Sequence, residues 1–279
     1  MKKYKFNYTS FTAIIVLFSV ILPSCTKEEL VNPPKVTLTT DWTNRNEGVA
    51  IPSPYTVVLN NKNLTFHSAT NTLPELEAGT YPITIYNPAD KITINGSTAT
   101  VATSGSIVDA QPGWFFSSSL DAVFENDKEE SLTAVMQQQV RLLNIELTIT
   151  DGDIANIESV TASLSGVANI LEMKTGVCSG AGLKVKPVFA QNGNKLSASL
   201  RLIGLTAEKQ ELILDITYKS KVDQQIISDV SSLLTGFNNN DKYKPLKLTG
   251  DMEIFTAIGI ESTIKGWALQ DEIISEIEP

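Results

Sequence analysis

Apolar and polar residues alternate with a period of two along much of this chain. The alternation is clear in residues 36–42, 145–149 and 212–218. Successive side chains of a β-strand point to opposite faces, so each segment predicts a strand with one buried face. Turn-forming sequences separate the apolar runs: Asn60-Asn61-Lys62-Asn63, Asn95-Gly96, Asp151-Gly152, Asn192-Gly193 and Phe237 to Asp241. Their spacing is typical of sandwiches of short antiparallel strands, so the chain is predicted to be all-β.

Helical signals are weak. Residues 228–234 ("SDVSSLL") predict about two turns of helix that Ser228 would cap and Gly236 would end. Residues 271–279 fit either an amphipathic helix or a last strand, and both interpretations stay open.

A domain boundary is expected near residue 130. The stretch "ENDKEES" at residues 125–131 is the most polar part of the middle of the chain, and such a change in composition is typical of a linker. The division gives an N-terminal sandwich over residues 36–130 and a C-terminal sandwich over residues 131–279. Each is long enough for about seven strands.

The first 24 residues have the pattern of a secretory signal peptide. Three lysines give a basic start, and residues 11–22 ("FTAIIVLFSVIL") form an apolar run too short to span a bilayer comfortably. The following "LPSC" resembles a bacterial lipobox, although Pro23 departs from its commonest form. We therefore predict a signal peptide over residues 1–24 and lipidation of Cys25. The alternative is a plain signal peptide with an incidental cysteine.

The residues after Cys25 carry a second signal. Lys27, Glu28 and Glu29 resemble the surface-export signal of Bacteroidetes lipoproteins, and the alternative is an ordinary solvated tether. Residues 25–35 would form the lipidated tether. Several acyl chains would hold it in the outer membrane, because each buried methylene contributes about 0.8 kcal/mol. We therefore expect a lipid-anchored protein exposed on the outer membrane.

The chain is acidic and has few cysteines. Its formal charge is −9, and it becomes −12 once the three lysines of the signal peptide are removed. Such a surface is unsuited to binding nucleic acid phosphates, so no nucleic acid partner is expected. If Cys25 is acylated, Cys178 has no partner within the chain and no internal disulfide can form.

Residues for catalysis or metal binding are scarce. His67 is the single histidine, so it cannot make the usual zinc site without a nearby cluster of other ligands, and a Ser/His/Asp triad would have to use it. No G-x-S-x-G motif or glycine-rich phosphate loop is present. Cys178 is expected to be a small apolar residue rather than a nucleophile. Asp151-Gly152-Asp153 is better explained as a hairpin turn than as a calcium loop. We expect no metal, no cofactor and no enzymatic activity.

Two other function classes stay open. Paired carboxylates for sugar hydrolysis are not recognisable from sequence, because the distance between two side chains is not encoded in their spacing. Trp42, Trp114 and Trp267, with Phe115 and Phe116, could form a stacking platform for glycans. Positions in the core are the favoured interpretation of these aromatic residues.

Six segments, in their order, resemble the fimbrillin-associated anchor lipoproteins of Bacteroidales and their relatives over nearly the whole mature chain. They are "AGTYPITIYN" (78–87), "MQQQVRLLNIELTI" (136–149), "IESVTASLSGVANIL" (157–171), "LSASLRLIGL" (196–205), "QELILDITY" (210–218) and "FTAIGIESTIKGW" (255–267). The resemblance implies two transthyretin-like antiparallel β-sandwich domains. It also implies a non-enzymatic role in anchoring or assembling fimbriae and in cell adhesion, with fimbrial subunits as partners through β-strand complementation.

Arg45 follows the first alternating segment, in "DWTNRNEG". The resemblance implies that shaft subunits are cut after their first strand by an arginine-specific or trypsin-like protease. Cleavage after Arg45 would remove the lipid-bearing piece, and the alternative is an uncut loop arginine. Whether the chain is an anchor, shaft or tip subunit stays open, and the alternative function is a surface glycan-binding lipoprotein that uses exposed aromatic residues.

Overall fold

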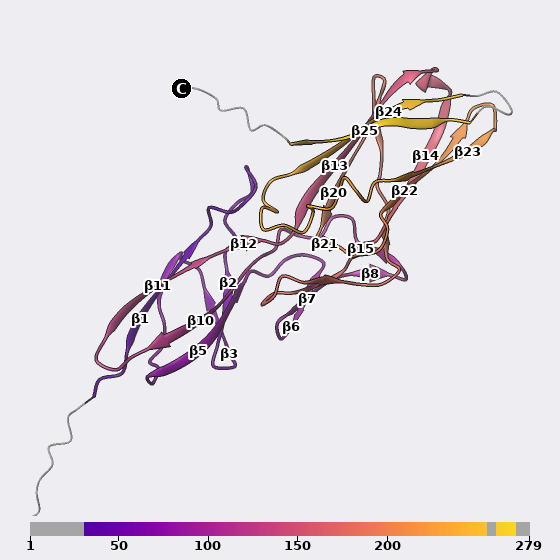
Figure 1. Ribbon diagram of the computed structural model, residues 1–279. Helices are drawn as coiled ribbons and strands as arrows, with labels where there is room; N and C mark the ends of the chain where they lie inside the picture. The colour runs from indigo at the N-terminus through magenta and orange to yellow at the C-terminus, as the bar shows by residue number, and fades with distance from the viewer. Residues whose placement is uncertain (1–30, 256–260, 272–279) are drawn as a thin grey trace, which may run out of the picture. The chain divides into compact units, whose positions relative to one another are not determined.

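The computed structural model describes residues 31–255 and 261–271. Within these ranges the chain forms the β-strands drawn in Figure 1 and one short 3-10 helix, η1 (Ile154–Asn156). The all-β prediction is confirmed. The described part holds no helix that is long and apolar enough to cross a membrane.

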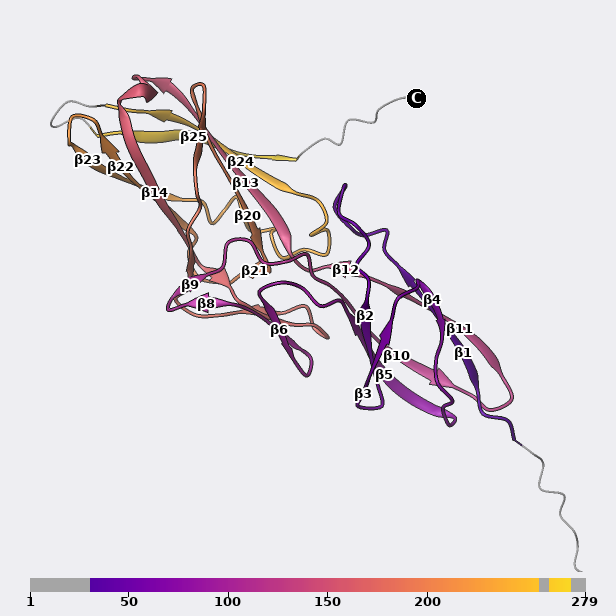
Figure 2. The same cartoon turned by 180° about the vertical axis from the view of Figure 1, so that it is seen from behind.

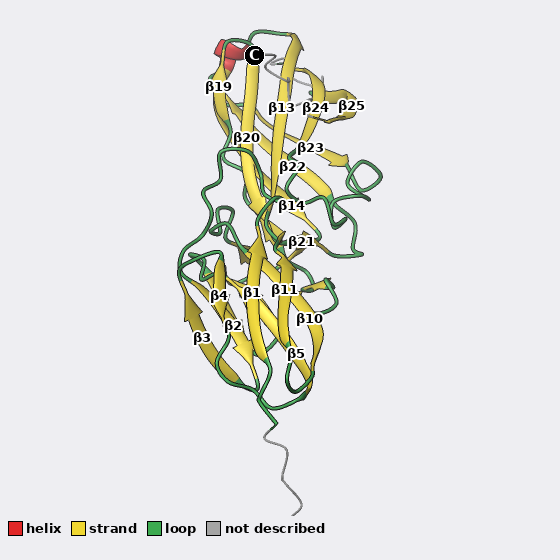
Figure 3. Ribbon diagram, turned by 90° about the vertical axis from the view of Figure 1, so that its left-hand side faces the viewer, coloured by secondary structure: helices red, strands yellow, loops and turns green. Residues whose placement is uncertain are grey.

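Two sheets are built mainly from the first half of the chain. In the three-stranded sheet, β1 (Lys35–Asp41) lies between β11 (Glu129–Val135) and β4 (Thr70–Thr72), as Figure 3 shows. The second sheet has the order β12-β10-β5-β2-β3. Its strands are β12 (Gln137–Gln138), β10 (Phe116–Phe124), β5 (Gly79–Tyr86), β2 (Tyr55–Leu59) and β3 (Lys62–Phe66).

Two further sheets come mainly from the second half. One has the order β19-β20-β13-β24-β25, made of β19 (Ala190–Asn192), β20 (Lys195–Leu202), β13 (Arg141–Asp151), β24 (Leu246–Glu253) and β25 (Thr263–Asp271). The other has the order β23-β22-β14-β18-β9-β8, and Figure 2 labels its strands β23, β22, β14, β9 and β8. Its strands are β23 (Asp223–Asp229), β22 (Glu211–Tyr218), β14 (Ile157–Ser165), β18 (Lys184–Val185), β9 (Ile107–Val108) and β8 (Thr103–Ser104).

Short strands complete the fold. A four-stranded sheet contains β17 (Cys178–Ser179), β16 (Ile170–Glu172), β7 (Thr98–Val101) and β6 (Ile92–Asn95), and β15 (Val167–Ala168) pairs with β21 (Gly204–Leu205). Most pairs are antiparallel, as expected. The pairs β1–β11, β13–β24 and β18–β9 are parallel, which the alternation of residues alone does not distinguish from antiparallel pairing.

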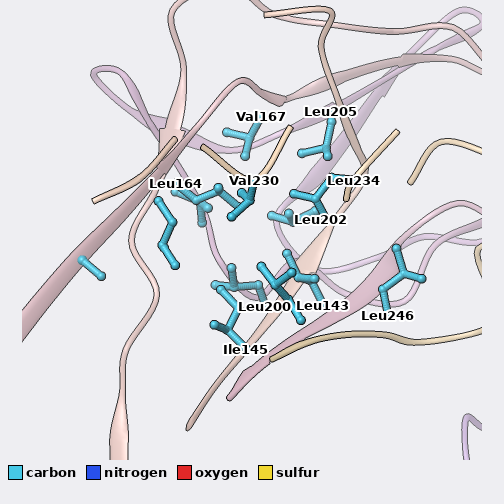
Figure 4. Close-up of a cluster of buried hydrophobic side chains, with 14 of the residues drawn as sticks. Leu143, Ile145, Leu164, Val167, Leu200, Leu202, Leu205, Val230, Leu234 and Leu246 are labelled. Atoms are coloured by element: carbon cyan, nitrogen blue, oxygen red, sulfur yellow. The ribbon is translucent and has the colours of Figure 1, made fainter. Parts of the chain in front are cut away.

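Buried apolar side chains form two clusters. The first core joins the three-stranded sheet to the sheet β12-β10-β5-β2-β3, through residues such as Leu38, Val57 and Ile85. The second core joins the two sheets of the second half, and Figure 4 shows Leu143, Ile145 and neighbouring leucines and valines gathered there. Burial of alternate residues on facing sheets explains the period of two in the sequence.

The chain passes from one hydrophobic core to the other at residues that differ from the boundary expected near residue 130. Residue 130 lies inside β11, which pairs with β1. The segment from Ala99 to Phe115 belongs to the second core, whereas Phe116 and Met136 return to the first. By their contacts, the described residues from Pro33 onward form one compact unit. The polar stretch at residues 125–131 covers the turn between β10 and β11 (residues 125–128) and the start of β11, and charged residues of the turn face solvent.

Two local predictions are wrong. Residues 228–234 are not a helix: Ser228 and Asp229 end β23, and turns with backbone bonds between residues three apart follow. Pairing of Ser228 with Leu212 holds the strand extended, so the ladder overrides the capping signal. Asp151-Gly152 is not a hairpin turn, because β13 and β14 belong to different sheets. It turns the chain from one face of the second core to the other.

Candidate assembly site around strand β1

The predicted site residues divide into two groups. Cys25, Lys27, Glu28 and Glu29 lie outside the described residues. Arg45 lies in the loop between β1 and β2, so the surroundings of β1 are the part of the predicted site that the structure describes. The geometry around β1 decides what removal or retention of this strand would do.

β1 is the middle strand of its sheet. It runs parallel to β11 from Lys35↔Glu129 to Asp41↔Val135, and antiparallel to β4 from Thr37↔Thr72 to Thr39↔Thr70. Both edges of β1 therefore supply backbone hydrogen bonds to a neighbour. If β1 left the sheet, the backbone groups that face it on β11 and β4 would lose their partners, and an edge-lined groove would open.

The inward face of β1 belongs to the first core. Val36 and Leu38 are 2% and 0% exposed, and Trp42, just after the strand, is 5% exposed. Full burial of each aliphatic side chain contributes about 1.5–3 kcal/mol. The Trp42 ring meets Tyr55 at 5.9 Å and Phe116 at 5.6 Å, both edge-on. β1 is thus fastened by its side chains as well as by its backbone.

A polar chain also closes the end of β1. The Trp42 indole Nε1 donates to Thr40 Oγ1 at 2.9 Å, and the Thr40 hydroxyl donates to the backbone oxygen of Ala69 at 3.2 Å. These groups are buried, so their mutual hydrogen bonds avoid the cost of an unpartnered polar atom. Trp42 is a core residue rather than part of an exposed platform.

Arg45 is held within its own loop. Its Nη1 donates to the Trp42 carbonyl at 2.8 Å and its Nε donates to the Val49 carbonyl at 3.0 Å. The guanidinium therefore closes the loop around two backbone oxygens, and the side chain is half-buried. A trypsin-like protease binds the arginine side chain in a pocket of its own, so cleavage after Arg45 requires this loop to open first.

Residue Asn46, where a cut chain would begin, is also bound. Its backbone N–H donates to Gln138 Oε1 at 2.7 Å, and its Nδ2 donates to the Tyr243 carbonyl at 3.1 Å. A cavity of about 610 Å³ lies beside it, lined by Arg45, Glu47 and Pro245 among others. The loop after β1 is thus connected to the segment before β24, which spacing in the sequence does not reveal.

Sequence reasoning missed a group of buried polar residues in the same region. Gln138, Arg141 and Lys242 are 2%, 3% and 4% exposed. The Gln138 amide donates to the Val140 carbonyl at 2.8 Å and to the Lys242 carbonyl at 3.2 Å. Arg141 donates to the Lys244, Gly236 and Phe237 carbonyls at 2.9–3.1 Å. For Gln138 and Arg141, a polar residue at an inward position of the alternating pattern is the signal that could have found them. Lys242 lies in a turn outside the strands, where the pattern gives no signal.

Cys178 and Lys242 meet in this region. Lys242 Nζ donates to the Ile203 carbonyl at 3.0 Å and lies 3.8 Å from Cys178 Sγ. Burial lowers the pKa of Lys242, and burial raises the pKa of the Cys178 thiol. A thiol with a raised pKa is a poor nucleophile, which agrees with the structural role expected for Cys178.

The remaining candidate residues do not assemble into a site. His67 is exposed, and the described residues contain no group of three or more His, Cys, Asp or Glu placed to hold a metal ion. Trp114 is half-buried with the Arg201 guanidinium 5.3 Å from its ring centre, and Trp267 packs against the second core. Neither tryptophan has an aromatic ring partner among the described ring pairs, so these pairs give no support to the alternative of a stacking platform.

Comparison with known proteins gives a family match. Residues 89–272 match the family model described as fimbrillin-A associated anchor proteins Mfa1 and Mfa2. No curated protein sequence matches the chain.

Solved structures share the fold at low sequence identity. A candidate adhesin from Bacteroides ovatus has 14% identity and a TM-score of 0.61, over 84% of this chain and 93% of that one. The fimbrial anchor protein Mfa2 from Porphyromonas gingivalis has 11% identity and a TM-score of 0.57, over 86% and 98%. A candidate polysaccharide-binding protein from Bacteroides thetaiotaomicron has 11% identity and a TM-score of 0.56, over 85% and 97%.

Proposed function

The chain belongs to the family of fimbrillin-A associated anchor proteins Mfa1 and Mfa2, and we propose that it anchors fimbriae to the outer membrane of the cell that makes it. Family membership supports a fimbrial, adhesin-like role. The attachment to the membrane rests on the sequence around Cys25. The proposed role is mechanical and non-enzymatic, and it uses no cofactor.

Cys25 is the proposed attachment point. Removal of residues 1–24 would expose it as the first residue, and its acyl chains would enter the outer leaflet. Lys27, Glu28 and Glu29 would direct the protein to the cell surface. The described domains begin within ten residues of Cys25, at β1 from Lys35, so force on a fimbria would pass to the lipid through a short segment.

We propose that the working form keeps β1 and is not cut after Arg45. The observation that carries this proposal is the pair of hydrogen bonds from the Arg45 guanidinium to the Trp42 and Val49 carbonyls. They close the loop that a protease would have to extend. The four-residue inward row from Val36 to Trp42 further holds β1 in the first core. An uncut chain retains its lipid, which is what an anchor requires.

Fimbrial subunits are the proposed partners, joined through β-strand complementation. An added strand would bond to an exposed strand edge and place alternate apolar side chains in its groove. Edges of several sheets are available for such pairing in the described part of the chain, for example β3, β23 and β25. The partner's own strand would supply the missing backbone bonds.

The test is the N-terminus of the protein as it exists on the cell. We expect mass spectrometry of the surface protein to find a lipidated Cys25 on the intact chain, and deletion of the gene to release fimbriae into the medium. A chain that begins at Asn46 in high-mass polymer would overturn the anchor role and make the protein a shaft subunit. Fimbriae that stay attached in the deletion strain would overturn it as well.

A further inference from the structure

The outer face of the sheet β12-β10-β5-β2-β3 carries a cavity of about 550 Å³. Its volume falls within the range of small-ligand sites, about 300–1,000 Å³. β2, β3 and β5 form its floor, and the β6–β7 hairpin adds Gly96 and Ser97. The cavity lies on the opposite side of this sheet from the first core. It is separate from β1 and the Arg45 loop.

The cavity lies over two rows of residues that face each other across the strands, and four members of these rows line it: Asn63, Val58, Thr84 and Tyr86. Asn63 on β3, Val58 on β2, Thr84 on β5 and Ser119 on β10 form one row. The next row consists of Thr65, Thr56, Tyr86 and Ser117. Six of these eight side chains carry a hydroxyl group, one carries an amide and none carries a charge. Residues paired in this way point to the same face of the sheet.

The turn between β2 and β3 adds two more amides. Asn60 and Asn61 adopt φ values of 50° and 58°, which asparagine tolerates better than most residues. Both line the cavity together with Asn63. In the part of the chain that the structure describes, no hydrogen bond engages the side-chain amides of these three residues. Three amides, each able to donate and accept, are therefore free to bind a ligand.

Two hydroxyl groups at the ends of the rows lack a protein partner. The Oγ atoms of Ser117 and Ser119 are buried without a hydrogen bond among the described residues, and Ser117 is 1% exposed. Buried hydroxyls without partners are uncommon because they lose the hydrogen bonds of water. Both serines extend the polar rows, but neither belongs to the lining of this cavity, and Ser119 lines a different one.

This cavity differs from three others in the charge of the residues that line it. Arg45 and Glu47 line the cavity beside the β1 loop, Lys91 and Asp109 line another, and Lys174 and Lys242 line a third. The cavity on the sheet face has no Asp, Glu, Lys, Arg or His in its lining. An anionic or cationic ligand would therefore find no counter-charge there. Its lining is an exception in a chain of which 19% is charged.

We propose that this cavity binds a neutral oligosaccharide. Sugar hydroxyls donate and accept hydrogen bonds, as do the free amides of Asn60, Asn61 and Asn63 and the hydroxyls of Thr84 and Tyr86. Val58, Pro82 and Ile94 give apolar patches against which the C–H faces of a sugar ring can pack. The proposal stands on the lining of the cavity and does not depend on the anchor role.

The test is glycan binding by the purified full-length protein. The probe is a printed array of neutral glycans together with their sialylated and sulfated counterparts, followed by calorimetric titration of the best neutral oligosaccharide. We expect saturable binding to neutral glycans that is unchanged by added salt, because no ion pair contributes. Absence of binding to every neutral glycan, or binding confined to charged glycans, would overturn the proposal.

Variants locate the binding in the cavity. Asn60→Gly with Asn61→Gly removes two amides and keeps the turn, because glycine accepts positive φ. Thr84→Val removes one hydroxyl and keeps the shape of the side chain. Each lost hydrogen bond should weaken binding roughly three- to tenfold. The control is Asn192→Ala, an exposed asparagine beside the β19–β20 turn, which should bind as the unchanged protein does. Equal binding by all variants would contradict the site.

Discussion

At the scale of single residues, Arg141 shows how backbone carbonyls stabilise a buried charge. Its side chain is 3% exposed and donates to three backbone carbonyls, and Nη1 also lies 3.3 Å from the half-exposed carboxylate of Asp241. The three carbonyls belong to the connection between β23 and β24, so one side chain organises a long loop. The planar guanidinium suits this task because its five N–H groups point in fixed directions.

We expect Arg141→Lys to destabilise the protein even though the charge is kept. A lysine ammonium cannot reach all three carbonyls from one position, and hydrogen bonds to a charged group contribute about 1.5–3 kcal/mol each. Urea unfolding should show a free energy of unfolding that is lower by at least the contribution of one such bond. The control is Arg201→Lys, whose guanidinium bonds an exposed glutamine, and for which a smaller effect is expected. Equal stability of Arg141→Lys and the parent would contradict this reading of the contacts.

The buried Lys242 side chain leads to a prediction about how the stability of the protein depends on pH. Burial lowers its pKa, so between the lowered value and the usual lysine value the unfolded chain binds more protons than the folded chain. Stability from this group therefore rises with pH across that window. We expect the stability gained by Lys242→Met to shrink as the pH is raised from neutral toward about 10, the ordinary lysine pKa.

The measurement is urea unfolding of both proteins at several pH values. It should be made with Cys178→Ser in both, because the raised pKa of this thiol makes stability fall at alkaline pH and would act in the opposite direction. A difference between the two proteins that does not depend on pH would show that Lys242 is protonated to the same extent in the folded and unfolded states.

At the scale of elements, β1 is held by an inward row and by two neighbouring strands. Leu38 is fully buried in the first core, whereas Thr37 lies on the other face of the same strand. Leu38→Ala should lower the free energy of unfolding by about 2–5 kcal/mol, as for other large-to-small changes in a core. Thr37→Ala should change it by much less. Similar effects of the two substitutions would argue against the register of β1.

A glycine substitution in the turn after β13 tests how closely this turn packs against the end of β24. Gly152 has φ +87°, and a Cβ there would clash with the Ile254 carbonyl oxygen, whereas Gly193 has φ +59° with open space around it. Gly193→Ala should cost about 1 kcal/mol, the price of the left-handed conformation alone. Gly152→Ala should cost clearly more because the end of β24 must also move. Thermal unfolding of the two variants compares them directly.

At the scale of the whole molecule, the signals proposed at the N-terminus are tested by where the protein is found on the cell. With Cys25→Ala, we expect the protein to lose lipid labelling and to leave the outer membrane fraction, because no acyl chain remains to hold it. With Lys27, Glu28 and Glu29 all changed to alanine, lipid labelling should persist while protease treatment of intact cells no longer reaches the protein. If the triple alanine variant is still exposed on the cell surface, these three residues are not an export signal.

Sequence alone determined the strand content, the inward rows and most turns of this protein. A period of two forces alternate residues to opposite faces, and Asn60-Asn61, Asn95-Gly96 and Asn192-Gly193 stand between paired strands as expected. The predicted helix at residues 228–234 failed because the capping preference of Ser228 is weaker than pairing with β22. The scarcity of catalytic residues was also readable, because chemistry depends on residue types that are counted directly.

Only the tertiary structure decided which distant segments meet. Strand order, the parallel pairing of β1 with β11 and the return of Phe116 to the first core depend on packing between residues far apart in the chain. The neutral cavity likewise combines Asn60, Thr84 and Ser97 from different strands and turns. The alternating pattern indicates which face of its strand each residue occupies. Which strand or sheet packs against that face is decided by the free energy of burying the two faces together. That free energy depends on residues from the whole fold.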